Sequence, residues 1–133
     1  MGSPASPFKV LVVEDDAAMA QMCAKLIRRR GHSAVIADSC LEALSIVQSS
    51  VGVDAVVSDI QMPVMSGIEL LAKVREIDAD LPVILMTGYA TSTSSSEALS
   101  LGATDYLAKP FNPDALIGSL ERAIHRPIVR PAV

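Results

Sequence analysis

The stretch Phe8-Lys9-Val10-Leu11-Val12-Val13-Glu14-Asp15-Asp16 decides the fold class of this chain. It begins as a short, mainly apolar run rich in β-branched side chains, and three acids end that run abruptly. A continuous apolar run of this length predicts a central strand of a parallel sheet, buried on both faces. The acids favour a helix start, because carboxylates suit the positive end of the helix dipole. The stretch therefore predicts a strand followed at once by a helix.

The helix predicted after residue 16 has apolar side chains spaced three and four residues apart. Arginines at its end suit the negative end of the helix dipole, and Gly31 is placed to terminate it. The apolar positions are Met19, Met22, Cys23, Leu26 and Ile27. We expect Met19, Met22 and Cys23 to pack in the core and Arg28-Arg29-Arg30 to be a solvated helix end.

The same alternation of strand and helix continues to about residue 125. Further strands are predicted at 33–37, 54–58, 82–86 and 104–107. Ser39 and Ser66 open helices as capping boxes, and Asn112-Pro113 opens the last helix. The tract 91–96 contains only serine and threonine, and these residues are poor helix formers, so the fourth helix is expected to start late, near Ser94. Five strands alternating with five helices predict one parallel sheet covered on both faces.

Composition narrows the class of protein. The chain has 133 residues, 50% of them hydrophobic, and its 15 acidic and 11 basic side chains give a net charge of −4. This length corresponds to one domain, and the composition excludes disorder as the general state. The acidic balance argues against direct contact with nucleic acid, and no apolar run approaches the ~20 residues that span a membrane. Cys23 and Cys40 fit no metal or redox spacing, so we expect reduced packing residues in a cytoplasmic protein.

The predicted domain covers residues 8–125. Residues 1–7 are rich in glycine, serine and proline, which predicts a disordered leader or an expression remnant. Residues 126–133 contain two prolines and are interpreted as a C-terminal tail or linker.

Polar side chains follow the predicted strands where each strand ends. Glu14-Asp15-Asp16 follow the first strand, Asp59 the third, Thr87 the fourth and Lys109 the fifth. The carboxyl ends of parallel strands meet at one edge of a sheet, where ligands bind. The topology therefore predicts one site with several carboxylates, a hydroxyl and an ammonium group.

Such a cluster of carboxylates needs a cation, because the charges repel one another at close range. Oxygen ligands in a partly solvated site suit Mg²⁺. If Glu14, Asp15 and Asp59 are ionised, one Mg²⁺ together with Lys109 restores neutrality. An Asp nucleophile that forms an aspartyl phosphate is a known catalytic mode, and a metal, a cation and the Thr87 hydroxyl supply what phosphoryl transfer requires.

Four segments of the chain resemble the receiver domain of two-component response regulators. They are Val12 to Asp16 (VVEDD), Ser58 to Gly67 (SDIQMPVMSG), Thr87 to Ala90 (TGYA) and Gly102 to Phe111 (GATDYLAKPF). The resemblance covers about residues 8–125 and has the motifs in the right order and spacing. It implies a flavodoxin-like, doubly wound sheet of five parallel strands in the order 2-1-3-4-5, with five helices on its two faces.

The resemblance also implies a chemistry. Asp59 would accept a phosphoryl group from a sensor histidine kinase or a phosphotransfer protein. Mg²⁺, or Mn²⁺ in its place, would be held by Glu14, Asp15, Asp59 and the backbone carbonyl of Gln61. Thr87 and Lys109 would contact the phosphoryl oxygens. The domain would act on no substrate other than itself, catalysing only its own phosphorylation and dephosphorylation.

The resemblance further implies a switch. Tyr106 would turn inward on activation, reshaping the surface formed by the fourth helix, fifth strand and fifth helix for an output domain or target protein. Phosphorylation-dependent dimers occur in such domains. Gln61 and Tyr89 flank the phosphoryl site, so we expect them to modulate the lifetime of the phosphorylated state. The Lys109–Pro110 bond is often cis in this family.

Two positions depart from the family pattern. Glu14 replaces the commoner aspartate, and its extra methylene points to a water-mediated metal contact. Ser66 replaces a frequent aspartate but keeps the helix-capping role. His32 and His125 have no acidic or cysteine partners at ligand spacing, so we interpret them as ordinary surface or capping residues.

Three other functions compete with this interpretation. A haloacid-dehalogenase-type phosphohydrolase also uses Asp, Mg²⁺, Thr and Lys, but it places a second Asp two residues after the nucleophile, where this chain has Gln61. A nucleotide- or flavin-binding module needs a Gly-rich or hydroxyl-rich turn after the first strand, and the acids at 14–16 would repel its phosphate. A receiver-like protein that only binds a partner has the same chemical residues, and a phosphodonor assay separates it.

Overall fold

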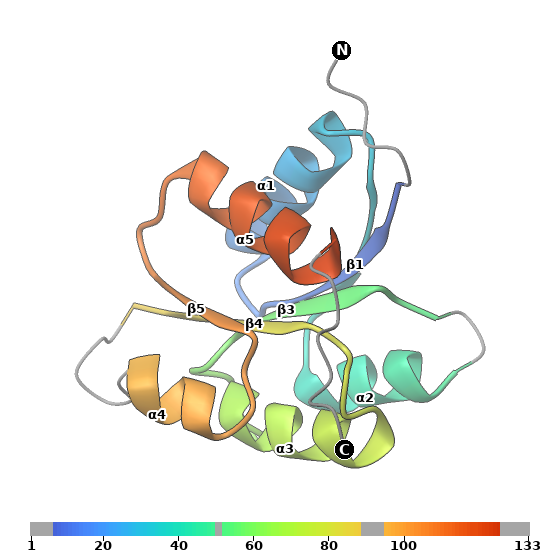
Figure 1. Ribbon diagram of the computed structural model, residues 1–133, viewed down its shortest axis with the longest axis vertical. Coiled ribbons are helices and arrows are strands. Elements are labelled where there is room, and N and C mark those ends of the chain that lie inside the picture. Colours follow the sequence, from blue (N-terminus) through green and yellow to red (C-terminus); the bar gives the residue numbers. More distant parts are fainter. Residues whose placement is uncertain (1–6, 50–51, 89–94, 126–133) are drawn as a thin grey trace, which may run out of the picture.

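The computed structural model describes residues 7–49, 52–88 and 95–125. Five strands alternate with five helices along the chain, as the sequence predicts (Figure 1). The strands are β1 (Lys9–Val13), β2 (Ser33–Ala37), β3 (Ala55–Asp59), β4 (Val83–Thr87) and β5 (Asp105–Ala108). The helices are α1 (Ala17–Arg29), α2 (Cys40–Gln48), α3 (Gly67–Ile77), α4 (Ser95–Ser100) and α5 (Pro113–His125).

The strands form one sheet in the order β2-β1-β3-β4-β5. All four neighbouring pairs are parallel, which confirms the doubly wound, flavodoxin-like architecture. Helices α1 and α5 cover one face of the sheet, and α2, α3 and α4 cover the other (Figure 1). The carboxyl ends of β1, β3, β4 and β5 therefore open at one edge between the two helical layers.

Alternation along the strands divides the core into two apolar layers, because successive side chains of a strand point to opposite faces. In β1, Val10 and Val12 belong to the layer under α1 and α5, whereas Leu11 and Val13 belong to the layer that includes α2 and α3. All four are fully buried. The continuous apolar run thus marks a strand covered on both faces, as predicted.

The helices begin at the capping residues that the sequence indicates. Asp16 accepts hydrogen bonds from the first turn of α1, and Ser66 forms a complete capping box at α3. The Ser39 box is incomplete: Ser39 accepts from Glu42 N–H, but the Glu42 carboxylate accepts from Asp38 N–H instead of the capping residue.

The described part of the fourth helix is Ser95–Ser100, so its expected late start is not tested. Its predicted cap, Ser94, lies outside the described residues, as do most of the predicted leader and all of the predicted tail. Within the described ranges, no helix combines the length and apolar character needed to cross a bilayer.

Two interpretations of single side chains were wrong. Met22 does not pack in the core but is 42% exposed. The buried face of α1 runs through Ala20, Cys23, Ala24 and Ile27, and Met22 lies at the margin of that face. His32 is not a surface residue but is 5% exposed: its ring stacks on Phe8, and its Nδ1 accepts from Phe8 N–H over 3.2 Å. The side chain of His125 lies outside the described part of the chain.

Other predictions of packing are confirmed. Cys23 and Cys40 are free and buried, and burial raises the pKa of each thiol to about 11. The three arginines at 28–30 are exposed at the end of α1.

Arg75 connects α3 to two turns. Its guanidinium donates to the Gly102 carbonyl at 2.8 and 3.0 Å, to the Leu81 carbonyl at 2.7 Å and to the Asp78 carbonyl at 3.3 Å. One side chain thus satisfies backbone acceptors both before β4 and in the turn between α4 and β5.

Candidate functional site

Strand register brings the predicted site residues together. Val13 of β1 pairs with Ser58 of β3, so the next residues, Glu14 and Asp59, are neighbours at the sheet edge. On the other side of β3, Asp59 pairs with Met86 of β4, next to Thr87. Thr87 in turn pairs with Ala108 of β5, the residue before Lys109. Residues spread over 95 positions thus meet at one edge.

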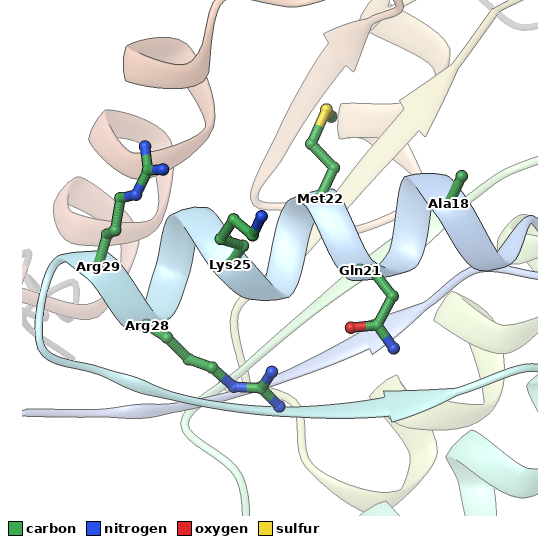
Figure 2. Close-up of a pocket in the computed structure, with 6 residues that line it drawn as sticks. All are labelled: Ala18, Gln21, Met22, Lys25, Arg28 and Arg29. Atoms are coloured by element: carbon green, nitrogen blue, oxygen red, sulfur yellow. The ribbon is translucent and has the colours of Figure 1, made fainter.

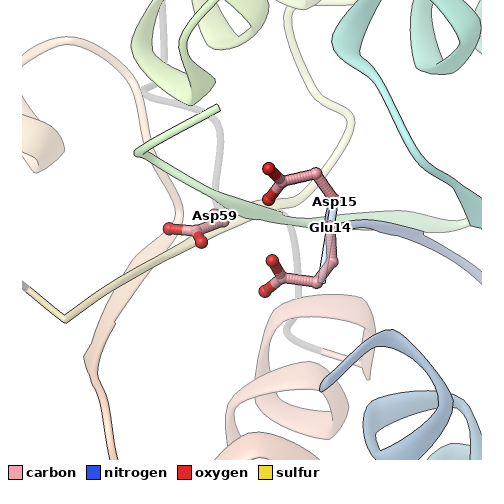
Figure 3. Close-up of side chains that lie close together, drawn as sticks. All are labelled: Glu14, Asp15 and Asp59. Carbon is pink, nitrogen blue, oxygen red and sulfur yellow. The ribbon is translucent and has the colours of Figure 1, made fainter. Parts of the chain in front are cut away.

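Three carboxylates cluster there. Glu14, Asp15 and Asp59 each offer an oxygen atom, and these atoms lie within 4.8 Å of one another (Figure 3). Glu14 and Asp59 are 2% and 7% exposed, whereas Asp15 is exposed to solvent. The cluster is therefore open on one side and buried on the other.

Lys109 lies between two of these acids. Its Nζ donates to Glu14 Oε1 and to Asp59 Oδ2, each over 2.9 Å, and its side chain is 17% exposed. Burial alone would lower the pKa of Lys109, but its hydrogen bonds and charge interactions with Asp59 and Glu14 outweigh burial and raise it. The ammonium is therefore held charged against the carboxylates. The Lys109–Pro110 bond is cis, as the resemblance implies.

Glu14 is the acid most affected by burial. Burial raises its pKa above the ordinary value, although the hydrogen bonds from Lys109 and from Asp16 N–H oppose this effect. The Asp16 N–H donates to Glu14 Oε2 over 3.2 Å. The Glu14 carboxylate is thus fixed at both oxygens, by the Lys109 ammonium on one side and by the backbone N–H of Asp16, the capping residue of α1, on the other.

The cluster fits a divalent cation with oxygen ligands. Opposite ligands of one Mg²⁺ are about 4.2 Å apart, twice the about 2.1 Å metal–oxygen distance; the oxygens here lie within 4.8 Å of one another, so small side-chain adjustments suffice to bring them to one ion. Ionised Glu14, Asp15 and Asp59 carry three negative charges and Lys109 one positive charge. The net charge of −2 is the charge that a divalent ion neutralises.

Thr87 and Gln61 form a second part of the site. The Thr87 hydroxyl, on a residue that is 1% exposed, donates to Gln61 Oε1 over 2.8 Å. The Gln61 N–H donates to Asp59 Oδ1 over 3.2 Å. Tyr106 is half-buried against the apolar layer that includes α3, and Tyr89 lies outside the described residues.

Gly67 is a residue of the site whose role sequence reasoning missed. A Cβ there would lie 2.4 Å from the Asp59 carbonyl oxygen and 2.9 Å from Ile60 Cα, and Gly67 N–H donates to the Ile60 carbonyl over 2.9 Å. Glycine thus allows α3 to begin directly against the end of β3. The signal was a glycine in a first helical turn, where alanine would ordinarily be favoured.

A separate recess of about 720 Å³ runs along α1. Figure 2 shows the side chains that line it, with Arg28 reaching toward the neighbouring strand, where it donates to the Ala34 carbonyl. None of the carboxylates lines this recess; its lining residues are Ala18, Gln21, Met22, Lys25, Arg28 and Arg29. The acidic cluster and the recess are therefore different features.

Comparison with known proteins gives one consistent family. A family model described as the response regulator receiver domain matches residues 10–121. The C4-dicarboxylate transport transcriptional regulatory protein DctD of Pseudomonas aeruginosa is 39% identical over 126 residues, covering 92% of this chain and 27% of DctD. The transcriptional regulatory protein FixJ of Bradyrhizobium diazoefficiens is 34% identical over 117 residues, covering 88% of this chain and 57% of FixJ.

Solved structures agree with the sequence matches. The receiver domain of the Francisella response regulator 1452 superposes with a TM-score of 0.83 at 33% identity, covering 90% of this chain and 98% of that domain. The present chain spans only about a quarter of the length of DctD and little more than half of FixJ. The family match, the strand order and the structural likeness coincide over the same residues, and the chain belongs to the response regulator receiver domain family.

Proposed function

We propose that this receiver domain takes a phosphoryl group on Asp59 from a sensor histidine kinase or a phosphotransfer protein. One observation carries the proposal: the Asp59 carboxylate, at the end of a central strand, shares Lys109 with Glu14 at 2.9 Å and has carboxylate oxygens of both Glu14 and Asp15 within 4.8 Å. A purely structural aspartate would not need two acids and a lysine gathered around it.

The transfer is a displacement at phosphorus. A carboxylate oxygen of Asp59 attacks the phosphorus of a phosphohistidine, a P–O bond forms, and the P–N bond breaks. The bonding electrons return to the imidazole nitrogen of the donor, which takes a proton from solvent. Lys109 and the Thr87 hydroxyl stabilise the negative charge on the transferred oxygens. Dephosphorylation is attack by water on the same acyl phosphate.

The carboxylates also support a metal requirement. Glu14, Asp15 and Asp59 would hold Mg²⁺ or Mn²⁺, with the Gln61 backbone carbonyl as a further ligand. The bound cation supplies positive charge that offsets the repulsion between the acids and the incoming phosphoryl group. The longer side chain of Glu14 fits a water-mediated contact, because Lys109 and Asp16 N–H already hold its oxygens.

Phosphorylation would act on a partner through the α4–β5–α5 surface. Addition of about −1.5 to −2 charge at Asp59 draws the Thr87 hydroxyl toward the phosphoryl oxygens, and Tyr106 on the adjacent strand fills the space that Thr87 leaves. An output domain, a target protein or a second copy of the domain would recognise the altered surface. The domain itself, with an acidic net charge, would not contact nucleic acid.

A transfer assay tests the proposal. The chain is incubated with Mg²⁺ and a small-molecule phosphodonor such as acetyl phosphate, and phosphoprotein is measured by intact mass. Asp59→Asn should abolish the mass increase. Asp54→Asn, at an exposed position directly before β3, should leave it unchanged. Labelling that survives in Asp59→Asn, or no labelling of the unmodified chain, would refute the proposal and favour a receiver-like module that only binds a partner.

A further inference from the structure

Ser58 places a hydroxyl group in the core, directly before the proposed acceptor. The residue is fully buried, and its neighbours in register are Val13 of β1 and Leu85 of β4. Both neighbours belong to the apolar layer that includes α2 and α3, and side chains in register point to the same face of a sheet. A hydroxyl group is unfavourable in such surroundings unless it forms a hydrogen bond.

The acceptor of the Ser58 hydroxyl is the backbone carbonyl of Asp59, at 3.0 Å. The peptide group that joins Asp59 to Ile60 is thus held at both ends, because its N–H donates to the Met86 carbonyl over 2.8 Å. The same Asp59 carbonyl oxygen lies against the start of α3, where an added Cβ at Gly67 would be 2.4 Å from it. The buried hydroxyl therefore fixes one particular peptide group, the one at which β3 ends and the loop to α3 begins.

This peptide group sets the course of the loop that carries Gln61. The Gln61 N–H donates to Asp59 Oδ1 over 3.2 Å, and the loop returns to its starting point where Gly67 N–H donates to the Ile60 carbonyl over 2.9 Å. The Gln61 carbonyl is the backbone ligand of the proposed cation site. A rotation of the peptide group after Asp59 would move this carbonyl relative to the Asp59 carboxylate.

We infer that Ser58 is a positioning residue for the cation site: its hydroxyl holds the Asp59–Ile60 peptide group so that the Asp59 carboxylate and the Gln61 carbonyl face one ion. The inference rests on the proposed function and extends it to a residue that touches only the backbone of a ligand. Groups that orient metal ligands commonly change metal affinity when they are removed. A serine that only filled space would affect stability and leave the affinity for the cation unchanged.

The test measures Mg²⁺ binding by isothermal titration calorimetry without a phosphodonor, so that the readout is independent of phosphoryl transfer. Ser58→Ala should raise the dissociation constant of Mg²⁺ about fivefold, the equivalent of one ordinary hydrogen bond. Ser58→Cys fills the space that alanine leaves but has only a weak S–H donor, so it should weaken binding as well.

Ser119→Ala is the matched control. Ser119 is also buried, and its hydroxyl donates to the carboxylate of Asp105, the first residue of β5, at the end of the sheet away from the acceptor. This variant loses a buried hydrogen-bonded hydroxyl too, but it should bind Mg²⁺ as tightly as the unmodified chain. Labelling by acetyl phosphate should be slowed about fivefold in Ser58→Ala at limiting Mg²⁺ and should recover at saturating Mg²⁺.

The outcomes separate this inference from the proposed function. Unchanged Mg²⁺ affinity in Ser58→Ala and Ser58→Cys, or equal weakening in Ser119→Ala, would overturn the role of Ser58 and leave the proposed acceptor standing. Weaker Mg²⁺ binding in the Ser58 variants alone, in a chain that acetyl phosphate does not label, would support the role of Ser58 and refute the acceptor. An unmodified chain that does not bind Mg²⁺ refutes the cation site and this inference with it.

Discussion

Replacing Lys109 by methionine removes the cation that holds two buried acids together. Its Nζ is 2.9 Å from an oxygen of Glu14 and of Asp59, whose side chains are 1% and 10% exposed. Removing one partner of a buried charge pair costs about 3–5 kcal/mol, because the remaining charge is uncompensated. Lys109→Met should therefore destabilise the fold strongly at neutral pH.

Protonation of Glu14 sets an upper limit on its part of this loss of stability. A buried Glu14 without its ammonium will take up a proton once that costs less than remaining charged. From the ordinary pKa of 4.5, protonation at pH 7 costs about 3.4 kcal/mol, at about 1.36 kcal/mol for each pH unit. At pH 5 the same cost is only about 0.7 kcal/mol.

The sign of the pH dependence follows from linkage. In Lys109→Met the folded-state pKa of Glu14 rises still further above its unfolded value, so the folded state binds more protons than the unfolded state above about pH 4.5. The contribution of Glu14 to the stability of Lys109→Met should therefore be fully present below about pH 4.5. It should be lost as the pH rises through the folded-state pKa of Glu14. Lys109 itself, whose pKa is raised from 10.5, stays charged throughout this range in the unmodified chain.

Urea unfolding at pH 5 and pH 7 measures the effect without Mg²⁺. The free energy of unfolding should fall by about 3 kcal/mol at pH 7 and by about 1 kcal/mol at pH 5. Lys73→Met makes the same charge change at an exposed position of α3 and should stay within about 0.5 kcal/mol of the unmodified chain. Added Mg²⁺ should restore stability at pH 7. A loss of equal size at both pH values would contradict the reasoning.

Three further substitutions test how the site is supported, each by urea unfolding. Gly67→Ala puts a Cβ 2.4 Å from the Asp59 carbonyl oxygen and should lower the free energy of unfolding by about 2–3 kcal/mol. The control Gly88→Ala, whose added Cβ would have nothing within 4 Å, should be neutral. Equal effects of the two substitutions would reject the steric argument. Val64 has a φ of +70° and is 93% exposed, so Val64→Asn should stabilise by about 1 kcal/mol; a loss of stability would show that the position is not strained. Arg75→Met should cost about 2 kcal/mol and speed hydrogen exchange in the α4–β5 turn, and unchanged exchange there would contradict its anchoring role.

Local patterns were sufficient to predict the order of the elements. The apolar run before Glu14 marks a strand buried on both faces, and caps such as Asp16 and Ser66 fix where helices begin. The helical spacing of apolar side chains could not show how much of each helix surface is buried, so Met22 was placed wrongly. His32 was placed wrongly because its partner, Phe8, lies 24 residues away, directly before β1.

The composition of the site was predictable because parallel strands bring their carboxyl ends to one edge. Glu14, Asp15 and Asp59 cluster as expected. What the sequence could not show is which groups bond to one another at rest. The contact between Thr87 and the Gln61 side chain depends on rotamers, and the role of Gly67 depends on how closely α3 approaches β3.

The central claim is that Asp59, and not the other carboxylate that Lys109 holds, is the phosphoryl acceptor, and chemical mapping of the acyl phosphate tests it most directly. After incubation with a phosphodonor and Mg²⁺, borohydride reduction converts a phosphorylated aspartate to homoserine, which peptide mass spectrometry locates. We predict homoserine at position 59 alone, and none when EDTA replaces Mg²⁺. Homoserine at position 15 or 16 in place of 59, or equal yield in EDTA, would contradict the claim.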